Sequence, residues 1–93
     1  MMQNIPAKFE KVSKEDLNKE ILRAAIIAEL DAVNFYEQMA ALTQDEEIKK
    51  ILLDVAKEEK THFGEFQHML LKLDPEQVKE LENGKKEVEE EIS

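Results

Sequence analysis

Apolar residues recur at spacings of three and four along two long segments of the chain, which is the pattern of amphipathic α-helices. The first segment covers residues 14–42 and contains neither glycine nor proline, and the second covers residues 45–73. A shorter helical segment follows at residues 75–92, and residues 1–12 form a leader. The pattern predicts an all-α fold in which the whole chain, residues 1–93, is one domain.

Each predicted helix start carries a capping pattern, in which a short polar side chain accepts backbone hydrogen bonds from the first turn. The three patterns are Ser13-x-x-Asp16, Thr43-x-x-Glu46 and Asp74-Pro75-Glu76-Gln77. Asn83-Gly84 is expected to break or cap the third helix before its last residues. Only two or three residues join the two long helices, so these helices are predicted to lie antiparallel.

One such hairpin cannot bury its own apolar surface. Each long helix has about 28 residues and spans roughly 40 Å at a rise of 1.5 Å per residue. The hairpin has two apolar faces and only itself to cover them, whereas two hairpins together make a four-helix bundle. We therefore predict an antiparallel two-helix hairpin plus a shorter C-terminal helix, dimerising into a four-helix bundle.

The apolar stripe of each long helix is interrupted in its middle by polar residues. At spacings of three and four, the second helix presents Ile48, Leu52, Val55, Glu59, His62, Phe66, Met69 and Leu73. The first helix presents Leu22, Ile26, Glu29, Val33, Tyr36 and Ala40 on the same rule. A lone carboxylate in an apolar core costs several kcal/mol unless it is paired, protonated or bound to a metal ion.

The polar residues on these stripes have the types and spacing of metal ligands. Glu59 and His62 are three residues apart and share a helix face, so both can reach one ion. Carboxylate oxygen with imidazole nitrogen suits iron, manganese or zinc better than calcium or magnesium. Carboxylate-bridged di-iron bundles use one Glu from each of two helices and a Glu-x-x-His from each of the other two. One chain supplies Glu29 and the Glu59–His62 pair, so two chains supply the full set.

Taken singly, each of these residues is more often a structural or solvated group than a ligand, and only their matched depth on two stripes favours a metal centre. Three further polar residues lie beside the stripes of the second helix. Glu58 and Glu65 flank the apolar stripe of the second helix, and His68 lies off it. The side chains of all three residues are therefore expected to be exposed. Glu58 and Glu65 could still serve as outer ligands.

The acidic composition narrows the range of partners. Thirteen Lys and Arg against 22 Asp and Glu give a net charge of −9, which argues against nucleic acid and is compatible with attracting cations. The absence of cysteine excludes disulfides and thiolate metal sites. No apolar run approaches the roughly 18 residues of a membrane span, and the start lacks the apolar core of a signal peptide. We expect a soluble cytoplasmic protein that binds neither nucleic acid nor membrane.

The stretches AIIAELDAVNFYEQMA and VAKEEKTHFGEF resemble the encapsulated ferritins, half-length members of the ferritin and rubrerythrin-like superfamily. The resemblance covers residues 18–73 and keeps the order and separation of both motifs. It implies a ferritin-like dimer with a di-iron ferroxidase centre at its interface, and a ring of dimers, typically a decamer. It also implies that Glu29 is the bridging ligand, that Glu59 and His62 form the Glu-x-x-His, and that Tyr36 supports the ligands.

The resemblance further implies iron as the cofactor, an encapsulin shell as the partner, and a place inside a nanocompartment that stores the oxidised iron. The chain departs from the family in the acidic residues along which metal ions arrive, because Ala28 replaces one of them while Asp31 resembles the other. Phe35 stands where some relatives have tryptophan. The chain ends EVEEEIS without the family's docking peptide. A trimmed free cargo protein and the N-terminal domain of a shell fusion are the alternatives.

Three functions remain as hypotheses. The first is a ferroxidase in which Glu29, Glu59 and His62 of two chains hold two iron ions, with oxygen as the acceptor and Tyr36 orienting a ligand carboxylate. The second is a flavin-binding electron-transfer cargo protein, which would be yellow and would stack the flavin on aromatic side chains. The third is a structural hairpin, which would tolerate apolar residues at the three ligand positions.

Overall fold

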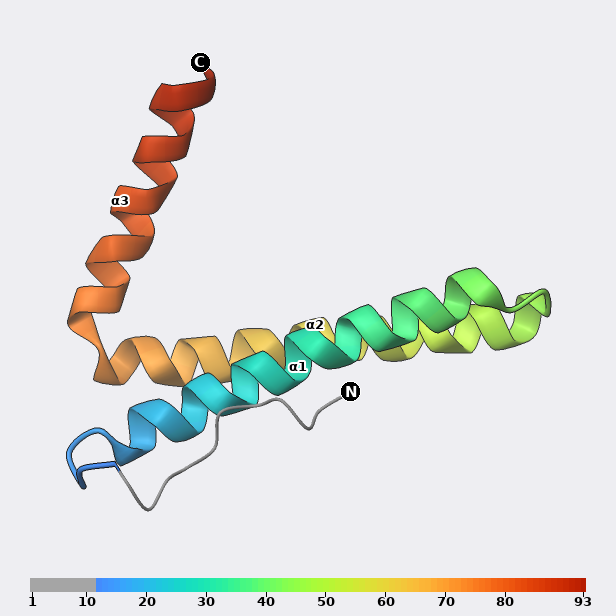
Figure 1. The fold of residues 1–93 in the computed structure, drawn as a ribbon, viewed down its shortest axis with the longest axis horizontal. Coiled ribbons are helices and arrows are strands. Elements are labelled where there is room, and N and C mark those ends of the chain that lie inside the picture. The colour runs from blue at the N-terminus through green and yellow to red at the C-terminus, as the bar shows by residue number, and fades with distance from the viewer. Residues whose placement is uncertain (1–11) are drawn as a thin grey trace.

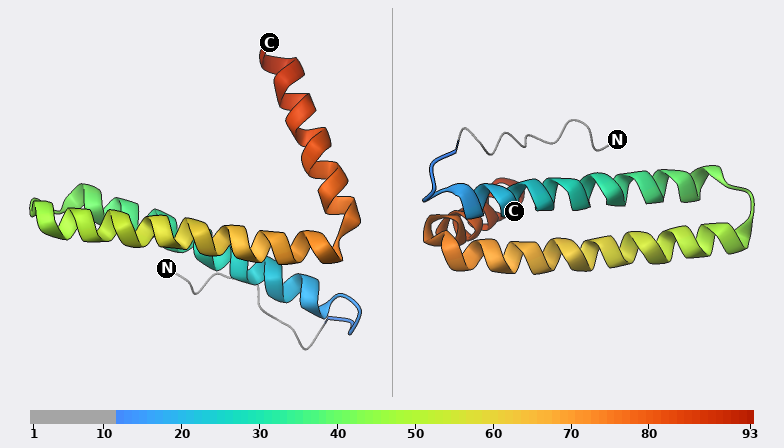
Figure 2. Two further views of the ribbon diagram at one scale, coloured as in Figure 1. Left: turned by 180° about the vertical axis from the view of Figure 1, so that it is seen from behind. Right: turned by 90° about the horizontal axis from the view of Figure 1, so that it is seen from below.

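The chain folds into three helices and no strand over residues 12–93, which are the residues that the computed structural model describes. The helices are α1 (Leu17–Leu42), α2 (Glu46–Leu73) and α3 (Pro75–Ile92). α1 and α2 form an antiparallel hairpin, and α3 leaves the end of α2 steeply and projects away from the hairpin (Figures 1 and 2). The predicted all-α class, with a two-helix hairpin and a shorter C-terminal helix, is confirmed.

The start of α1 differs from its prediction. The helix begins at Leu17 rather than at residue 14, and the residues just before it form a turn. Ser13 was predicted as the cap, but its hydroxyl donates to Asp16 Oδ2 at 3.1 Å. Asp16 occupies the N-cap position without a side-chain bond to the backbone, because its carboxylate faces Ser13 and the ammonium group of Lys19.

The start of α2 also uses a different cap from the predicted one. Asp45 Oδ1 accepts hydrogen bonds from the backbone N–H groups of Glu47 at 2.9 Å and Ile48 at 3.0 Å. Thr43, the predicted cap, accepts instead from the N–H of Asp45 at 3.2 Å. A carboxylate next to the positive end of the helix dipole is the stronger acceptor, so Asp45 takes the capping role.

The start of α3 is as predicted, but its interior is not. Asp74 Oδ1 accepts from the N–H of Gln77 at 3.0 Å, and Pro75 occupies the first helical position. The predicted break at Asn83-Gly84 is wrong, because the helix runs through both residues to Ile92. Asn83 donates to Glu80 Oε1 at 3.0 Å within the helix, and the roughly 1 kcal/mol cost of one glycine is too small to end it.

The core between α1 and α2 is built from few and mostly small side chains. The buried apolar residues among those described are Ala32, Val33, Ala40, Ala56 and Leu70. Short side chains let the two helix backbones approach closely, but they remove little apolar area from water. The hairpin is therefore held together by a narrow seam rather than by a broad core.

The chain exposes more surface than a compact domain of its length. Its radius of gyration is 16.5 Å, against about 12 Å for a compact chain of this size. Its accessible surface is 7442 Å², against about 5,500 Å² from the usual size scaling. The exposed large apolar side chains are Ile21, Ile27, Leu30, Met39, Leu42, Ile48, Ile51, Leu53, Met69, Leu73, Val78, Leu81, Val88 and Ile92. Apolar surface on this scale indicates association.

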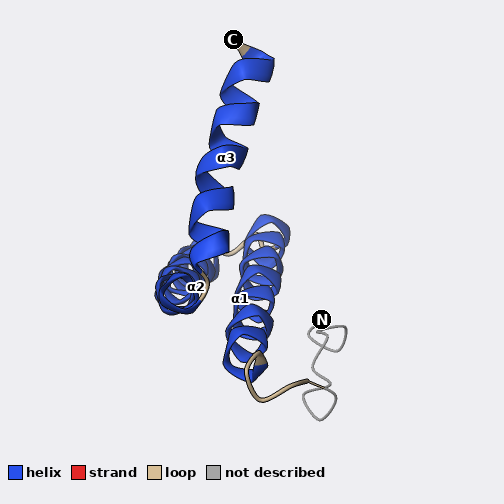
Figure 3. Cartoon of the chain, turned by 90° about the vertical axis from the view of Figure 1, so that its left-hand side faces the viewer, coloured by secondary structure: helices blue, strands red, loops and turns tan. Residues whose placement is uncertain are grey.

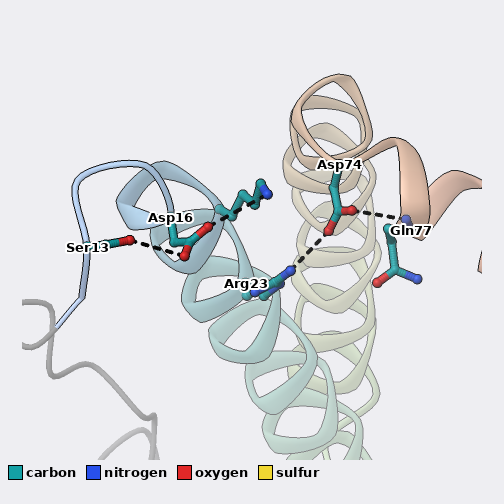
Figure 4. A network of polar contacts seen from close by, with 6 residues as sticks. Ser13, Asp16, Arg23, Asp74 and Gln77 are labelled. Carbon is teal, nitrogen blue, oxygen red and sulfur yellow. Dashed lines mark hydrogen bonds and ion pairs between the residues drawn. The ribbon is translucent and has the colours of Figure 1, made fainter.

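The corner between the hairpin and α3 is tied by one carboxylate. Asp74 is buried, and its Oδ2 pairs with Nη2 of Arg23 on α1 at 3.0 Å while its Oδ1 caps α3 (Figure 4). The N–H of Gln77, followed by the guanidinium of Arg23, lowers the pKa of Asp74 below its usual 3.8. A single side chain thus connects α1 to the junction of α2 and α3.

Replacing Asp74 with alanine is expected to lower the unfolding temperature at neutral pH, because it removes both the cap of α3 and the partner of Arg23. Since the folded-state pKa is depressed, the ionised carboxylate stabilises the fold above its unfolded value of 3.8. This contribution is lost as the pH falls through the folded-state pKa. Thermal unfolding followed by circular dichroism should show parent and variant converging in acid, and an unchanged gap at every pH would contradict this role.

Candidate metal centre

The structure brings Glu29, Glu59 and His62 together in the middle of the hairpin. One ligand atom of each lies within 4.8 Å of the others. Nδ1 of His62 is 3.6 Å from Glu29 Oε2 and 3.7 Å from Glu59 Oε2. These separations are too long for hydrogen bonds. They match two donors that each lie about 2.1 Å from a common ion, because such donors are about 3–4 Å apart.

The three residues meet because of where they stand on the two helices. Glu59 and His62 occupy one side of α2 at a spacing of three, and α1 runs antiparallel beside them. Glu29 comes from the middle of α1 at the same height. No loop contributes to this cluster, so rigid helical backbone positions all three donors.

The surroundings make the metal-free cluster electrostatically unfavourable. The side chains of Glu29 and Glu59 are only 17 % and 19 % exposed. Oε2 of Glu29 is buried and has no hydrogen-bond partner. Burial raises the pKa of Glu29, and the neighbouring Glu59 raises it further, while His62 opposes the shift. A cation among these donors would satisfy the orphaned oxygen and cancel the repulsion between the two carboxylates.

The donor set fits a transition-metal ion but leaves its coordination incomplete. Two carboxylates and one neutral imidazole suit iron, manganese or zinc. A di-iron bundle centre needs four glutamates and two histidines, so three donors are half of such a centre. His62 is 45 % exposed, which leaves one side of the cluster open on the surface of the hairpin.

The remaining predicted site residues lie outside the cluster. Tyr36 is half-buried and packs edge-to-face against Phe35 with ring centroids 5.3 Å apart. No hydrogen bond joins Tyr36 to the three donors among the contacts of residues 12–93. Asp31 is half-buried with an unpartnered, buried Oδ2, and Glu58 and Glu65 are exposed. His68 is also exposed, as predicted.

One interhelical contact beside the cluster was not predicted. Lys60 of α2 pairs with Glu37 of α1, with Nζ and Oε2 3.2 Å apart. These residues directly follow Glu59 and Tyr36 in the sequence, so the pair ties the two helices close to the candidate site. Both side chains are exposed, and the pair contributes about 1 kcal/mol or less. The sequence shows opposite charges on the two predicted helices. It does not show which of these residues lie at the same height along the hairpin.

An all-helical hairpin with Glu on one helix and Glu-x-x-His on the other has the helices and donor types of one half of a ferritin-like bundle. Comparison with known proteins agrees with this class. Residues 4–84 match the profile of the EncFtn-like family, and the chain belongs to this family. A crystal structure of the encapsulated ferritin domain from Pyrococcus furiosus has a TM-score of 0.82 and 61% identity, covering 86% of this chain and 82% of that chain.

Two curated proteins are also similar to the chain. The ferritin-like–encapsulin shell fusion protein of Pyrococcus furiosus is 65% identical over 78 residues, which are 84% of this chain and 22% of that protein. The encapsulin nanocompartment cargo protein EncC of Myxococcus xanthus is 40% identical over 68 residues, which are 73% of this chain and 52% of that protein. The chain thus spans about a fifth of the first relative and about half of the second. The predicted resemblance to encapsulated ferritins is confirmed.

Proposed function

We propose that two copies of this chain oxidise ferrous iron with dioxygen at a pair of iron ions held between them. The observation that carries the proposal is the cluster of Glu29, Glu59 and His62, in which a buried carboxylate oxygen has no partner. The cluster has half the ligands of a di-iron centre. A second copy would supply the other half and cover part of the exposed apolar surface.

The chain's own residues account for binding and for the preference for ferric iron. Glu29 and Glu59 supply hard anionic oxygens, which favour the more highly charged ferric ion over the ferrous ion. His62 binds through Nδ1 only when that nitrogen is unprotonated. Two ferrous ions held by these donors would together give two electrons to one dioxygen, which with two protons from solvent would leave as hydrogen peroxide. We assign to Tyr36 the orientation of a ligand carboxylate in the completed bundle, since it lies on the same stripe of α1 as Glu29.

The polar residues around the cluster support a route for incoming ions. Glu58 and Glu65 are on the side of the hairpin to which the cluster opens, by helical spacing from His62, whereas Asp31 follows Glu29 by two residues and lies on another side of α1. Their negative charge would attract cations toward the donors. We propose that these three residues act as outer or transient ligands, in spite of the alanine at position 28.

The names of the relatives support a setting for the reaction. One is named as a fusion with an encapsulin shell and the other as an encapsulin cargo protein. We infer that this domain works inside an encapsulin nanocompartment of the cytoplasm, with the ferric product passing to the shell interior. We further infer a ring of dimers, a decamer. No helix of residues 12–93 is long and apolar enough to cross a membrane.

Anaerobic titration with ferrous iron tests the proposal. We expect one iron ion per chain, hence two per dimer, and rapid growth of ferric absorbance after a pulse of oxygen. Elemental analysis and native mass spectrometry give the stoichiometry. Iron that does not bind, or binds without being oxidised, would contradict the ferroxidase. A yellow protein with flavin absorbance would instead favour the electron-transfer alternative, and a colourless protein without metal would favour a structural hairpin.

A further inference from the structure

The dipeptide Asn83-Gly84 lies within α3, a helix that few contacts hold in place. No residue of α3 is buried, and the helix packs only against α2 and extends well clear of the hairpin (Figures 1 and 3). Isolated helices shorter than about 12–15 residues are marginal in water, because most helical stability comes from packing. The part of α3 after Gly84 is shorter than this, so we expect it to open and close repeatedly.

The sequence of this part of α3 weakens it further. Gly84 is a poor helix former, and a Cβ placed on it would meet nothing within 4 Å, so no close packing compensates for it. Positions 89–91 are glutamates at the negative end of the helix dipole, and the last turn has no basic residue. Val88 and Ile92 are exposed, at 57 % and 77 %. This end of α3 therefore has neither packing nor a favourable dipole charge to keep it closed.

The helical conformation protects Asn83 from reaction with the residue that follows it. The side-chain amide of Asn83 donates to Glu80 Oε1 at 3.0 Å, which directs it back along the helix and away from Gly84. The backbone N–H of Gly84 is held, by the helical pattern, on the carbonyl four residues earlier. The helical ψ of about −42° also differs from the ψ that a five-membered ring through Asn83 requires. Reaction between the two residues therefore needs the helix to open.

We propose that Asn83 is a site of spontaneous deamidation, reached when the end of α3 opens. In the open chain, the backbone nitrogen of Gly84 attacks Cγ of Asn83, and the new C–N bond closes a five-membered succinimide. Nδ2 leaves as ammonia and takes the proton of the Gly84 N–H. Water then opens the ring at either carbonyl and leaves aspartate or isoaspartate. No electrons are exchanged, and water is the only co-reactant. Gly84 has no Cβ, so the attack is unhindered.

Both products weaken the helix at this position. Isoaspartate routes the backbone through the side chain and adds one carbon to it, so the hydrogen bonds from each N–H to the fourth preceding carbonyl lose their register. Aspartate has no N–H to donate, so the bond to Glu80 Oε1 is lost and two carboxylates stand one turn apart. Deamidation thus shortens α3 to the part that precedes residue 83.

Two other asparagines of the chain provide internal controls. Asn18 and Asn34 lie on α1, which packs along α2, and the side chains of Lys19 and Phe35 follow them. Both are exposed, whereas Asn83 is half-buried. Exposure alone would therefore make them react first, and reaction gated by opening of α3 makes Asn83 react first.

Peptide mass mapping of the full chain during incubation in mildly alkaline buffer tests the proposal. We expect the peptide that contains Asn83 to gain the mass difference between amide and acid while Asn18 and Asn34 stay amides. Electron-transfer fragmentation should show both aspartate and isoaspartate. The matched control is Asn83→Gln, which keeps the amide and the helix but needs a less favourable six-membered ring, and it should not convert. A parent chain in which Asn83 converts no faster than the asparagines of α1 would overturn the proposal.

Two further variants test whether opening of the helix controls the rate, because they leave Asn83-Gly84 itself unchanged. Glu91→Lys places a cation at the end of the helix, four residues after Glu87, and should slow conversion about fivefold. Glu87→Gly lowers the helix propensity and should speed it about threefold. In strong denaturant, where no helix remains, both variants should convert at the parent rate. Equal rates in native buffer, or differences that persist in denaturant, would show that α3 does not gate the reaction.

Discussion

Replacing Glu29 with leucine is expected to abolish rapid oxidation of ferrous iron and, in metal-free protein, to raise the unfolding temperature. Activity is lost because each of the two ions would lose a carboxylate ligand. Altering even the groups behind a ligand weakens metal sites about 10–100-fold, so we expect a loss of at least about 100-fold in rate. Stability rises because the buried, unpartnered Oε2 and its repulsion with Glu59 are removed.

The stabilisation should be of order 1 kcal/mol, or about 4–8 °C for a chain of this length. Stopped-flow absorbance gives the oxidation rate, and calorimetry of protein treated with chelator gives the unfolding temperature. Asp54→Leu is the control, since it removes an exposed carboxylate from the same hairpin and should change neither quantity. A Glu29→Leu protein that oxidises iron at the parent rate would show that the site is elsewhere. One that unfolds at a lower temperature would show that Glu29 stabilises the metal-free fold.

The candidate site was predictable because its geometry follows from helical spacing and one antiparallel turn. Glu59 and His62 share a face by a rule that holds for every α-helix, and the length of the two helices brings Glu29 to their height. Only the relative height of α1 and α2 had to be inferred. The roles of the more distant residues could not be predicted in the same way. Tyr36 stands two turns along α1 from Glu29, and Asp31 stands only two residues from Glu29 but on another side of the helix, so small rotations decide whether either contacts a ligand.

The features that sequence analysis missed are of two physical kinds. Helix ends depend on competition between neighbouring polar groups that differ by about 1 kcal/mol or less, so Asp45 displaces Thr43 as a cap. Contacts distant in sequence depend on the rotation and register of whole helices. Arg23 and Asp74 are 51 residues apart, and no local pattern shows that they meet.

Removing metal with a chelator is expected to separate the paired chains. Each chain offers three donors, so an ion binds well only where two chains meet, and binding therefore stabilises the pair. At free metal about 100 times above the dissociation constant, each site contributes about 2.7 kcal/mol. Two sites would then tighten the pairing by about 10⁴-fold. Without metal, the four glutamates of two clusters face one another across the interface and repel.

Sedimentation velocity over a dilution series measures this effect, with ferrous iron under argon in one arm and chelator in the other. The experiment uses the parent chain, and the mean mass is compared between the two arms. We expect a larger mean mass with metal than with chelator at the same concentration. The Glu29→Leu variant should give association that no longer responds to metal, because the repulsion and the ligands disappear together. If the protein with Glu29 pairs equally tightly with metal and with chelator, apolar contacts alone hold the dimer. The half-sites would then not be coupled to its assembly.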